Sequence, residues 1–301
     1  MTTVDVCDLI REAADKAILP RFMPGRDSSE TASQKEDDSF VTIADSEAEE
    51  ILTSTLKANS GEEYTILGEE EHGDSPISKA QSAALSTTYG WTIDPLDGTR
   101  AYVQGRPHFA TMVSEIRDSI VVRSWIYLPV FREMWVTEND RVYLNGELVV
   151  PMADSHRRLR GVAYKEAHSP NNEGFLCGRG SGSVGVDYTH MARGVIDFIG
   201  HKQPKPWDHF PGAHMITTLG GMVALAASPK MLYSPGYVMP PVTKHSILAA
   251  SNSTAWAKAA SHLYTPSASY FAKKVYPQCT CRIGTLVANP ECQIHGLQPS
   301  L

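Results

Sequence analysis

The hydrophobic pattern at the start of the chain is helical. Apolar residues recur every three or four positions from residue 4 to about residue 20, where Pro20 interrupts the pattern. This period is typical of an amphipathic helix. Residues 26–39 are polar and lack a period, which indicates a mobile surface loop. A second helical stripe follows, and we expect Asp45 to cap the N-terminus of that helix.

Strand-like runs dominate the next ninety or so residues. We expect strands at 64–67, 89–93, 111–116, 120–127, 133–137 and 142–149, the last divided by a hairpin turn at Asn145-Gly146. This half of the chain is therefore predicted to be helices followed by a strand meander.

The pattern changes after residue 160. We expect a helix ending near Arg193, a strand at 195–199, a helix at 210–219 with Asp208 just ahead of it as an N-cap, and a strand at 222–225. Alternating strands and helices are typical of an α/β lobe. We therefore divide the chain into an N-terminal α+β lobe (1–150), a C-terminal α/β lobe (151–263) and a tail (264–301) of unknown order.

Composition and charge exclude several classes of protein. The chain has 301 residues, is 42% hydrophobic and 20% charged, and has a formal net charge of -7. The sequence has no cluster of Lys and Arg that could form a basic stripe along a nucleic-acid backbone. It also has no apolar run near the ~20 residues that span a membrane. We see no secretory signal and expect a cytoplasmic protein that binds neither nucleic acid nor membrane.

The cysteines do not form a disulfide framework. Their number is odd, five, and reduced thiols are the simpler interpretation. Three of them lie in the tail close to His295, but their spacing matches no common zinc pattern. A loosely ordered extension with free thiols is therefore favoured over a zinc site formed by Cys279, Cys281, Cys292 and His295.

Two aspartates close the apolar run WTIDPLDGT. Asp94 and Asp97 would repel each other unless a cation lay between them. Their spacing would place both carboxylates and the Leu96 carbonyl on one side of a loop, with the N–H groups of Gly98 and Thr99 directed outward as an anion-binding nest. A β-turn with aspartate caps is the alternative explanation.

Two more acidic segments favour a cation site over the β-turn. Glu69 opens the GEEE segment, which alone is most simply a solvated acidic turn, and Asp208 alone is most simply a helix cap. Together with the aspartate pair they supply several oxygen ligands, the type that Mg²⁺ prefers, beside a phosphate nest. We expect His108, His209 and His214 to be structural histidines.

These segments resemble the inositol monophosphatase family of Mg²⁺-dependent, lithium-sensitive phosphatases. LGEEE, WTIDPLDGTRAY and WDHFPG followed by Gly-Gly occur in the family's order, and the resemblance covers about residues 4–260. It implies an α+β fold, a layered αβαβα sandwich. It also implies two or three Mg²⁺ ions, held by Glu69, Asp94, the Leu96 carbonyl, Asp97 and Asp208.

The resemblance also implies roles in catalysis. Gly98 and Thr99 would bind the phosphate, while Glu69 and Thr99, with Asp45 behind them, would orient and deprotonate the attacking water. Ser183, Val184, His201 and Asp208 would lie against the substrate. His201 stands where inositol-specific members have a glutamate, which alters the alcohol that is favoured.

The resemblance leaves the substrate open. It implies a phosphomonoesterase acting on a small alcohol phosphate such as inositol monophosphate, and a homodimer. Histidinol phosphate and 3'-phosphoadenosine 5'-phosphate are alternative substrates. A regulatory binding protein that keeps the fold is the alternative outside the enzyme class.

Overall fold

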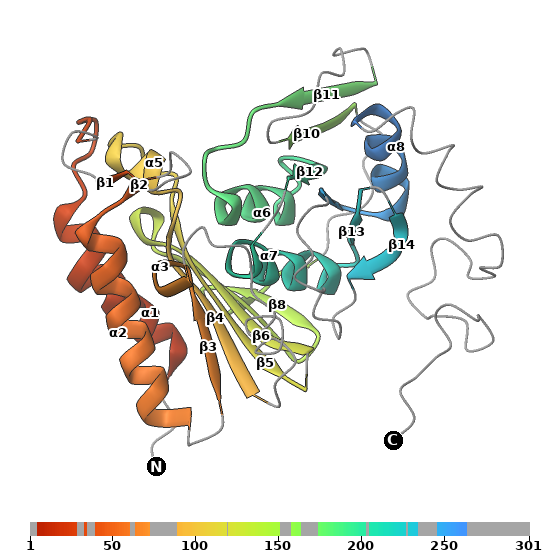
Figure 1. The fold of residues 1–301 in the computed structure, drawn as a ribbon. Coiled ribbons are helices and arrows are strands. Elements are labelled where there is room, and N and C mark those ends of the chain that lie inside the picture. The colour runs from red at the N-terminus through yellow and green to blue at the C-terminus, as the bar shows by residue number, and fades with distance from the viewer. Residues whose placement is uncertain are drawn as a thin grey trace.

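The computed structural model describes residues 5–28, 33–34, 40–60, 64–72, 89–118, 120–150, 158–163, 174–202, 205–226, 228–233 and 246–263. Helices and sheets alternate in layers: a helix pair, a seven-stranded sheet, a second helix pair, a six-stranded sheet and an outer helix (Figure 1). This is the αβαβα sandwich implied by the sequence. The tail with its cysteines and His295 lies outside the described residues.

The first layer consists of the N-terminal helix and α2 (Ile43–Ser60). The N-terminal helix starts as α1 (Val6–Ala13) and continues as a π-turn, η1 (Ala14–Ile18), and a 3₁₀ turn, η2 (Leu19–Arg21). The sequence predicted one regular helix here. Pro20 explains the difference, because it has no N–H to bond the carbonyl four residues earlier.

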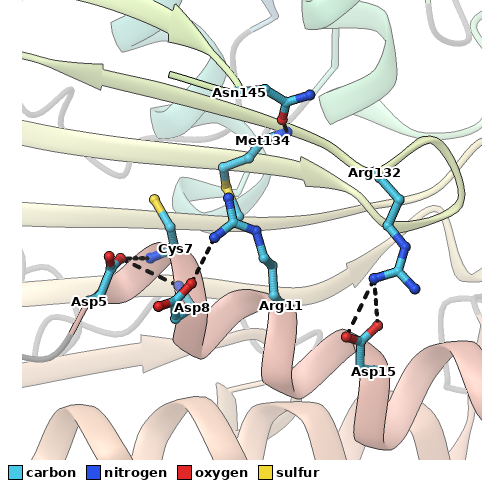
Figure 2. Close-up of polar contacts among 8 residues, drawn as sticks. All are labelled: Asp5, Cys7, Asp8, Arg11, Asp15, Arg132, Met134 and Asn145. Atoms are coloured by element: carbon cyan, nitrogen blue, oxygen red, sulfur yellow. Dashed lines mark hydrogen bonds and ion pairs between the residues drawn. The ribbon is translucent and has the colours of Figure 1, made fainter. Parts of the chain in front are cut away.

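Polar contacts hold the N-terminal helix at its start and near its middle (Figure 2). The Asp5 carboxylate accepts a hydrogen bond of 2.8 Å from the Cys7 N–H and so caps α1. Further along, the Arg132 guanidinium donates to the Asp15 carboxylate at 3.0 Å. This ion pair joins η1 to the turn that follows the 3₁₀ segment η4 (Pro129–Phe131).

The seven-stranded sheet has the order β3-β4-β5-β6-β7-β8-β9, and only β3 and β4 are parallel. The expected strands are confirmed to within a residue or two, except that β4 runs four residues further. The strands are β3 (Thr65–Gly68), β4 (Tyr89–Asp97), β5 (Ala110–Arg117), β6 (Ile120–Leu128), β7 (Glu133–Glu138), β8 (Arg141–Leu144) and β9 (Glu147–Leu148).

The hairpin turn predicted at Asn145-Gly146 is confirmed. Both residues have positive φ, +50° and +86°, as a two-residue type I′ turn requires. The Asn145 side chain also accepts a hydrogen bond of 2.9 Å from the Met134 N–H (Figure 2). The turn therefore ties the end of β8 to the start of β7.

The predicted loop at 26–39 is partly wrong. β1 (Ser33–Gln34) pairs antiparallel with β2 (Phe40–Val41). Backbone pairing needs no hydrophobic period in so short a strand, so the polar composition gave no indication of it.

The second helix layer is formed by α6 (Val184–Ala192) and α7 (Pro206–Thr218). The sequence placed the start of α7 at residue 210. It begins four residues earlier because Pro206 occupies the first helical position, where its fixed φ and missing N–H are favourable.

The second sheet has the order β11-β10-β12-β15-β13-β14. The strand predicted at 195–199 begins only at Phe198, because the Val195 N–H still bonds back to the His190 carbonyl at the end of α6. The strands are β10 (Leu159–Ala163), β11 (Phe175–Gly178), β12 (Phe198–His201), β13 (Met222–Leu225), β14 (Ser228–Tyr233) and β15 (Ile247–Ala250), and α8 (Ser253–Leu263) covers the outer face.

Three hydrophobic cores lie between the layers and hold them together. One joins α1 and α2 to the first sheet, a second joins the other face of that sheet to α6, α7 and the second sheet, and a third lies under α8. The ends of β3 and β4 thereby come to face α6 and α7. Among the described residues, no helix combines the length and apolar character needed to cross a membrane.

Candidate active site

Both aspartates of the DPLD segment belong to β4. Asp94 pairs with Met112 and Asp97 with Ala110, so four residues of β4 oppose three of β5. Pro95 explains this bulge because it has no N–H for the ladder, and its carbonyl instead accepts a hydrogen bond of 2.9 Å from the Thr111 hydroxyl. The segment is a bulged strand and not the β-turn considered as an alternative.

Three carboxylates converge beside this bulge. Glu69 is the first residue of α3 (Glu69–His72), Asp94 lies on β4 and Asp208 is the third residue of α7. One carboxylate oxygen from each lies within 4.8 Å of the others. Asp94 is buried, and Glu69 and Asp208 are half-buried.

Burial and mutual repulsion make this cluster costly without a cation. Burial is the main reason that the pKa values of Asp94 and Asp208 lie well above the usual value, and the charges of Glu69 and Asp97 raise both further. Hard oxygen donors that converge in a partly dry site fit Mg²⁺ or a similar divalent ion. Glu69, Asp94 and Asp208 therefore could hold a metal.

Asp97 is held by the start of α6. Its carboxylate accepts hydrogen bonds from the Ser183 hydroxyl and the Gly185 N–H, both 2.6 Å, and from the Val184 N–H at 3.1 Å. Burial raises the pKa of Asp97 to about 6, against the opposing effect of these bonds. Ser183 and Val184, which were expected at the substrate, thus contact this predicted metal ligand.

Asp45 does not occupy the N-cap position of α2. Thr42 precedes the helix, and its hydroxyl oxygen accepts from the Ala44 N–H at 3.2 Å. Asp45 is the third helical residue, and it accepts from the Thr42 N–H at 2.8 Å and the Thr42 hydroxyl at 2.6 Å. The prediction was wrong because Thr42 and Asp45 together form a reciprocal cap resembling a capping box.

Asp45 also meets Thr99. The Thr99 hydroxyl oxygen lies 3.0 Å from an Asp45 carboxylate oxygen and 3.0 Å from the Leu96 carbonyl oxygen, and either can accept its proton. Burial raises the pKa of Asp45 to about 6. The structure thus brings Asp45, Thr99 and the Leu96 carbonyl together.

Asp208 is not an N-cap either. The cap position is occupied by Lys205, and Pro206 begins α7. Asp208 lies inside the first turn, where its carboxylate reaches Glu69 and Asp94. The early start of the helix, set by the proline, therefore places Asp208 in the acidic cluster, where the resemblance implied a metal ligand, and not at the cap position.

Gly98 allows the two halves of the site to meet. Its φ of +92° disfavours other residues, and a Cβ at this position would lie 2.8 Å from the Ser183 Cβ. Gly98 and Thr99 lead into α5 (Thr99–Val103) directly after Asp97. The predicted phosphate-binding residues therefore lie at the contact between β4 and the start of α6.

The histidines near α7 are buried. His201 ends β12 with 7% exposure, and burial lowers its pKa to about 4. The His209 ring nitrogen lies 2.6 Å from the Tyr188 hydroxyl, and that of His214 lies 3.0 Å from the Ser124 hydroxyl. His209 and His214 have the side-chain partners expected of structural histidines, and His108 packs its ring against Phe131.

Glu49 was not among the site residues predicted from the sequence. This buried residue of α2 accepts hydrogen bonds from the N–H groups of Glu70 and Glu71, 2.9 Å each. The helical spacing could have predicted that Glu49 is buried. It lies on the same buried stripe of α2 as Asp45, Leu52 and Leu56.

Comparison with known proteins settles the family. Residues 2–265 match the model of the inositol monophosphatase family. The chain belongs to this family of phosphatases.

Proteins that are similar in sequence to this chain differ in name. A protein of Aquifex aeolicus (strain VF5) described as fructose-1,6-bisphosphatase/inositol-1-monophosphatase is 25% identical over 242 residues, which are 75% of this chain and 86% of that protein. Nus factor SuhB of Vibrio cholerae is 28% identical over 208 residues, 63% of this chain and 73% of its own.

The fold comparison agrees with the family. The structure of Thermotoga maritima IMPase has a TM-score of 0.68 at 16% identity, covering 88% of this chain and 97% of that one. At this identity the likeness shows the fold alone.

Proposed function

We propose that this protein is a Mg²⁺-dependent phosphomonoesterase that hydrolyses a small alcohol phosphate such as inositol monophosphate. The observation that supports this most strongly is the convergence of Glu69, Asp94 and Asp208 oxygens within 4.8 Å, in a chain of a phosphatase family. Oxygen-only ligand sets favour Mg²⁺ over softer metals.

Asp97 and the Leu96 carbonyl complete the proposed ligand set for two or three ions. A carboxylate has about four acceptor positions, and the three bonds from α6 leave Asp97 with capacity for a cation. Bound Mg²⁺ would lower the pKa of water and neutralise charge on the phosphate oxygens. Inhibition by lithium is part of this proposal.

The remaining roles are assigned to groups around the cluster. We assign phosphate binding to the N–H groups of Gly98 and Thr99, which follow the bulge. Asp45, fixed by Thr42, orients the Thr99 hydroxyl. Glu69 accepts the proton of the water that attacks phosphorus, with Thr99 holding that water in line.

The alcohol part of the substrate is assigned to the side of the site formed by Ser183, Val184, His201 and Asp208. A lowered pKa keeps His201 neutral at physiological pH, so it can exchange hydrogen bonds with hydroxyl groups and adds no charge. This favours a neutral polyol, while histidinol phosphate and 3'-phosphoadenosine 5'-phosphate remain the alternative substrates. A cytoplasmic homodimer is part of the same proposal.

A regulatory binding role is the second candidate. It is favoured by the similarity to a protein described as Nus factor SuhB. Catalysis is favoured instead because all four proposed side-chain metal ligands are carboxylates: Glu69, Asp94, Asp97 and Asp208.

Phosphate release from a substrate panel tests the proposal. The panel contains inositol 1-phosphate, histidinol phosphate and 3'-phosphoadenosine 5'-phosphate, each with Mg²⁺, with chelator and with added Li⁺. We expect one preferred, chelator-sensitive substrate. Asp94→Asn should reduce turnover at least about 100-fold, because even outer-shell partners of metal ligands contribute 10–100-fold.

Asp140→Asn is the matched control, since Asp140 lies in an exposed turn at φ +55°, which asparagine also adopts. An Asp94→Asn variant with full Mg²⁺-dependent turnover would contradict the proposal. Folded wild-type protein that is inactive on the whole panel would support the regulatory candidate.

A further inference from the structure

Helix α2 presents two buried carboxylates to the site. Asp45 and Glu49 are 1% and 7% exposed and lie one helical turn apart on the same face. Asp45 binds Thr42 and Thr99. Glu49 has no role in the reaction described above, although it lies on the same side of the helix.

The contacts of Glu49 are directed at the segment that bears Glu69. One carboxylate oxygen accepts from the Glu70 N–H and the other from the Glu71 N–H, each at 2.9 Å. The first N–H groups of any helix have no intrahelical acceptor. Because two oxygens bind two successive N–H groups, the carboxylate fixes both the position and the rotation of α3, which Glu69 begins.

Gly68 makes this approach possible. A Cβ at position 68 would overlap the Glu49 carboxylate. The φ of Gly68 lies outside the left-handed region, so its missing side chain matters here for space rather than for backbone freedom. Glu49 and Gly68 therefore fit each other.

Electrostatics oppose this arrangement. Burial raises the pKa of Glu49, and the charges of Glu69 and Glu71 raise it further. A buried acid beside further acids is unfavourable unless its hydrogen bonds, or a function, compensate. The hydrogen bonds from the Glu70 and Glu71 N–H groups lower this pKa and offset part of the cost.

We propose that Glu49 is a positioning residue that binds the backbone of α3 and so directs the Glu69 carboxylate at Asp94 and Asp208. This inference rests on the proposed function, because it assigns Glu49 a part in building that metal site. Glu49 itself touches neither metal nor substrate.

Mg²⁺ binding by Glu49→Gln tests the inference. Glutamine keeps the shape of the side chain but loses one of the two acceptors. We expect Mg²⁺ affinity, measured by titration calorimetry with the metal alone, to fall 10–100-fold, and turnover at saturating Mg²⁺ to fall less. Glu50→Gln, an exposed change on the same helix, should stay within about twofold of wild type.

A double-mutant cycle tests the contact independently of catalysis. Gly68→Ala should weaken Mg²⁺ binding and lower the urea midpoint of unfolding, because the new methyl group displaces Glu49. In a Glu49→Ala background the same change should lower the midpoint less, since the overlapping carboxylate is gone. Additive effects would show that the two residues do not depend on each other, and would contradict the inference.

The outcomes separate the two proposals. If wild type binds Mg²⁺ and Glu49→Gln binds it as Glu50→Gln does, the positioning role is wrong and the proposed function stands. If folded wild type neither binds Mg²⁺ nor releases phosphate, the proposed function is wrong and the role of Glu49 falls with it. Should Glu49→Gln not fold, Gly68→Ala supplies the same Mg²⁺ measurement.

Discussion

His214 lies in α7 with its Nδ1 3.0 Å from the hydroxyl oxygen of Ser124 on β6. Burial lowers the pKa of His214 from 6.5 to about 4. Below pH 6.5 the unfolded chain therefore binds a proton that the folded chain rejects, so the contribution of this residue to stability falls as the pH drops towards 4. Between pH 7 and pH 5 the expected loss is about 2 kcal/mol.

Urea unfolding at the two pH values measures this loss. His214→Asn keeps a polar group near the Ser124 hydroxyl but cannot titrate. We expect the variant to lose about 2 kcal/mol less than wild type over the same interval. An equal loss in both proteins would contradict this assignment of the pKa.

At the residue scale, the sequence identified the types of site residue better than their contacts. Asp45 and Asp208 were predicted as caps because an acidic residue before an apolar stripe is most often one. Thr42 and Pro206 began the helices earlier, which moved both acids into the first turn. Glu49 was missed because its partners are backbone N–H groups 21 and 22 residues away, and no local pattern encodes such a contact.

Among the elements, the hairpin of β8 and β9 shows how one side chain sets a turn. Asn145 combines a φ of +50° with a side-chain hydrogen bond of 2.9 Å from the Met134 N–H. Asn145→Ala loses this bond and strains the backbone, and we expect a loss of about 2 kcal/mol in the free energy of unfolding. Asn145→Asp keeps the acceptor and tolerates the left-handed backbone, so it should cost less than about 1 kcal/mol.

Asn139→Ala is the control for the backbone contribution, since Asn139 has a φ of +49° in the turn before β8. The excess loss in Asn145→Ala over Asn139→Ala, measured by urea unfolding, is the contribution of the bond to Met134. Equal losses would mean that the bond adds nothing to stability.

Strand prediction succeeded in one sheet and was incomplete in the other. In the first sheet, most strands are long and separated by short hairpins, so pattern and turn residues agree. In the second sheet, β10 and β11 are five and four residues long and contain Gly161 and Gly178. Such short strands lack a clear alternation, and their pairing is fixed only by the assembled core.

At the scale of the whole molecule, the acidic cluster lowers the stability of the metal-free protein because its carboxylates repel one another. The raised pKa values of Asp94 and Asp208 mean that the metal-free native state binds protons more tightly than the unfolded chain. Its stability therefore falls as the pH rises above about 4, the usual pKa of these groups. A neutral amide at position 94 removes one charge and can still accept the bond from the Leu96 N–H.

Asp94→Asn should consequently melt at a higher temperature than wild type in chelator at pH 7. Added Mg²⁺ should stabilise wild type, by about 2.7 kcal/mol at a hundred times its dissociation constant, and should stabilise the variant much less. Calorimetric melting of both proteins with Mg²⁺ and with chelator checks this. A variant that melts below wild type in chelator would show that the repulsion is small.

The contact between Asp97 and α6 has a consequence for how the chain acquires activity. The bond from the Gly185 N–H to Asp97 spans 88 residues, and Asp208 is supplied later still. A growing chain can complete the first sheet before these groups leave the ribosome, because domains form as units during synthesis. A chain that has formed only the first sheet therefore holds Glu69, Asp94 and Asp97 but lacks Asp208. The acidic cluster is completed last, and chelation should slow the last kinetic phase of refolding most.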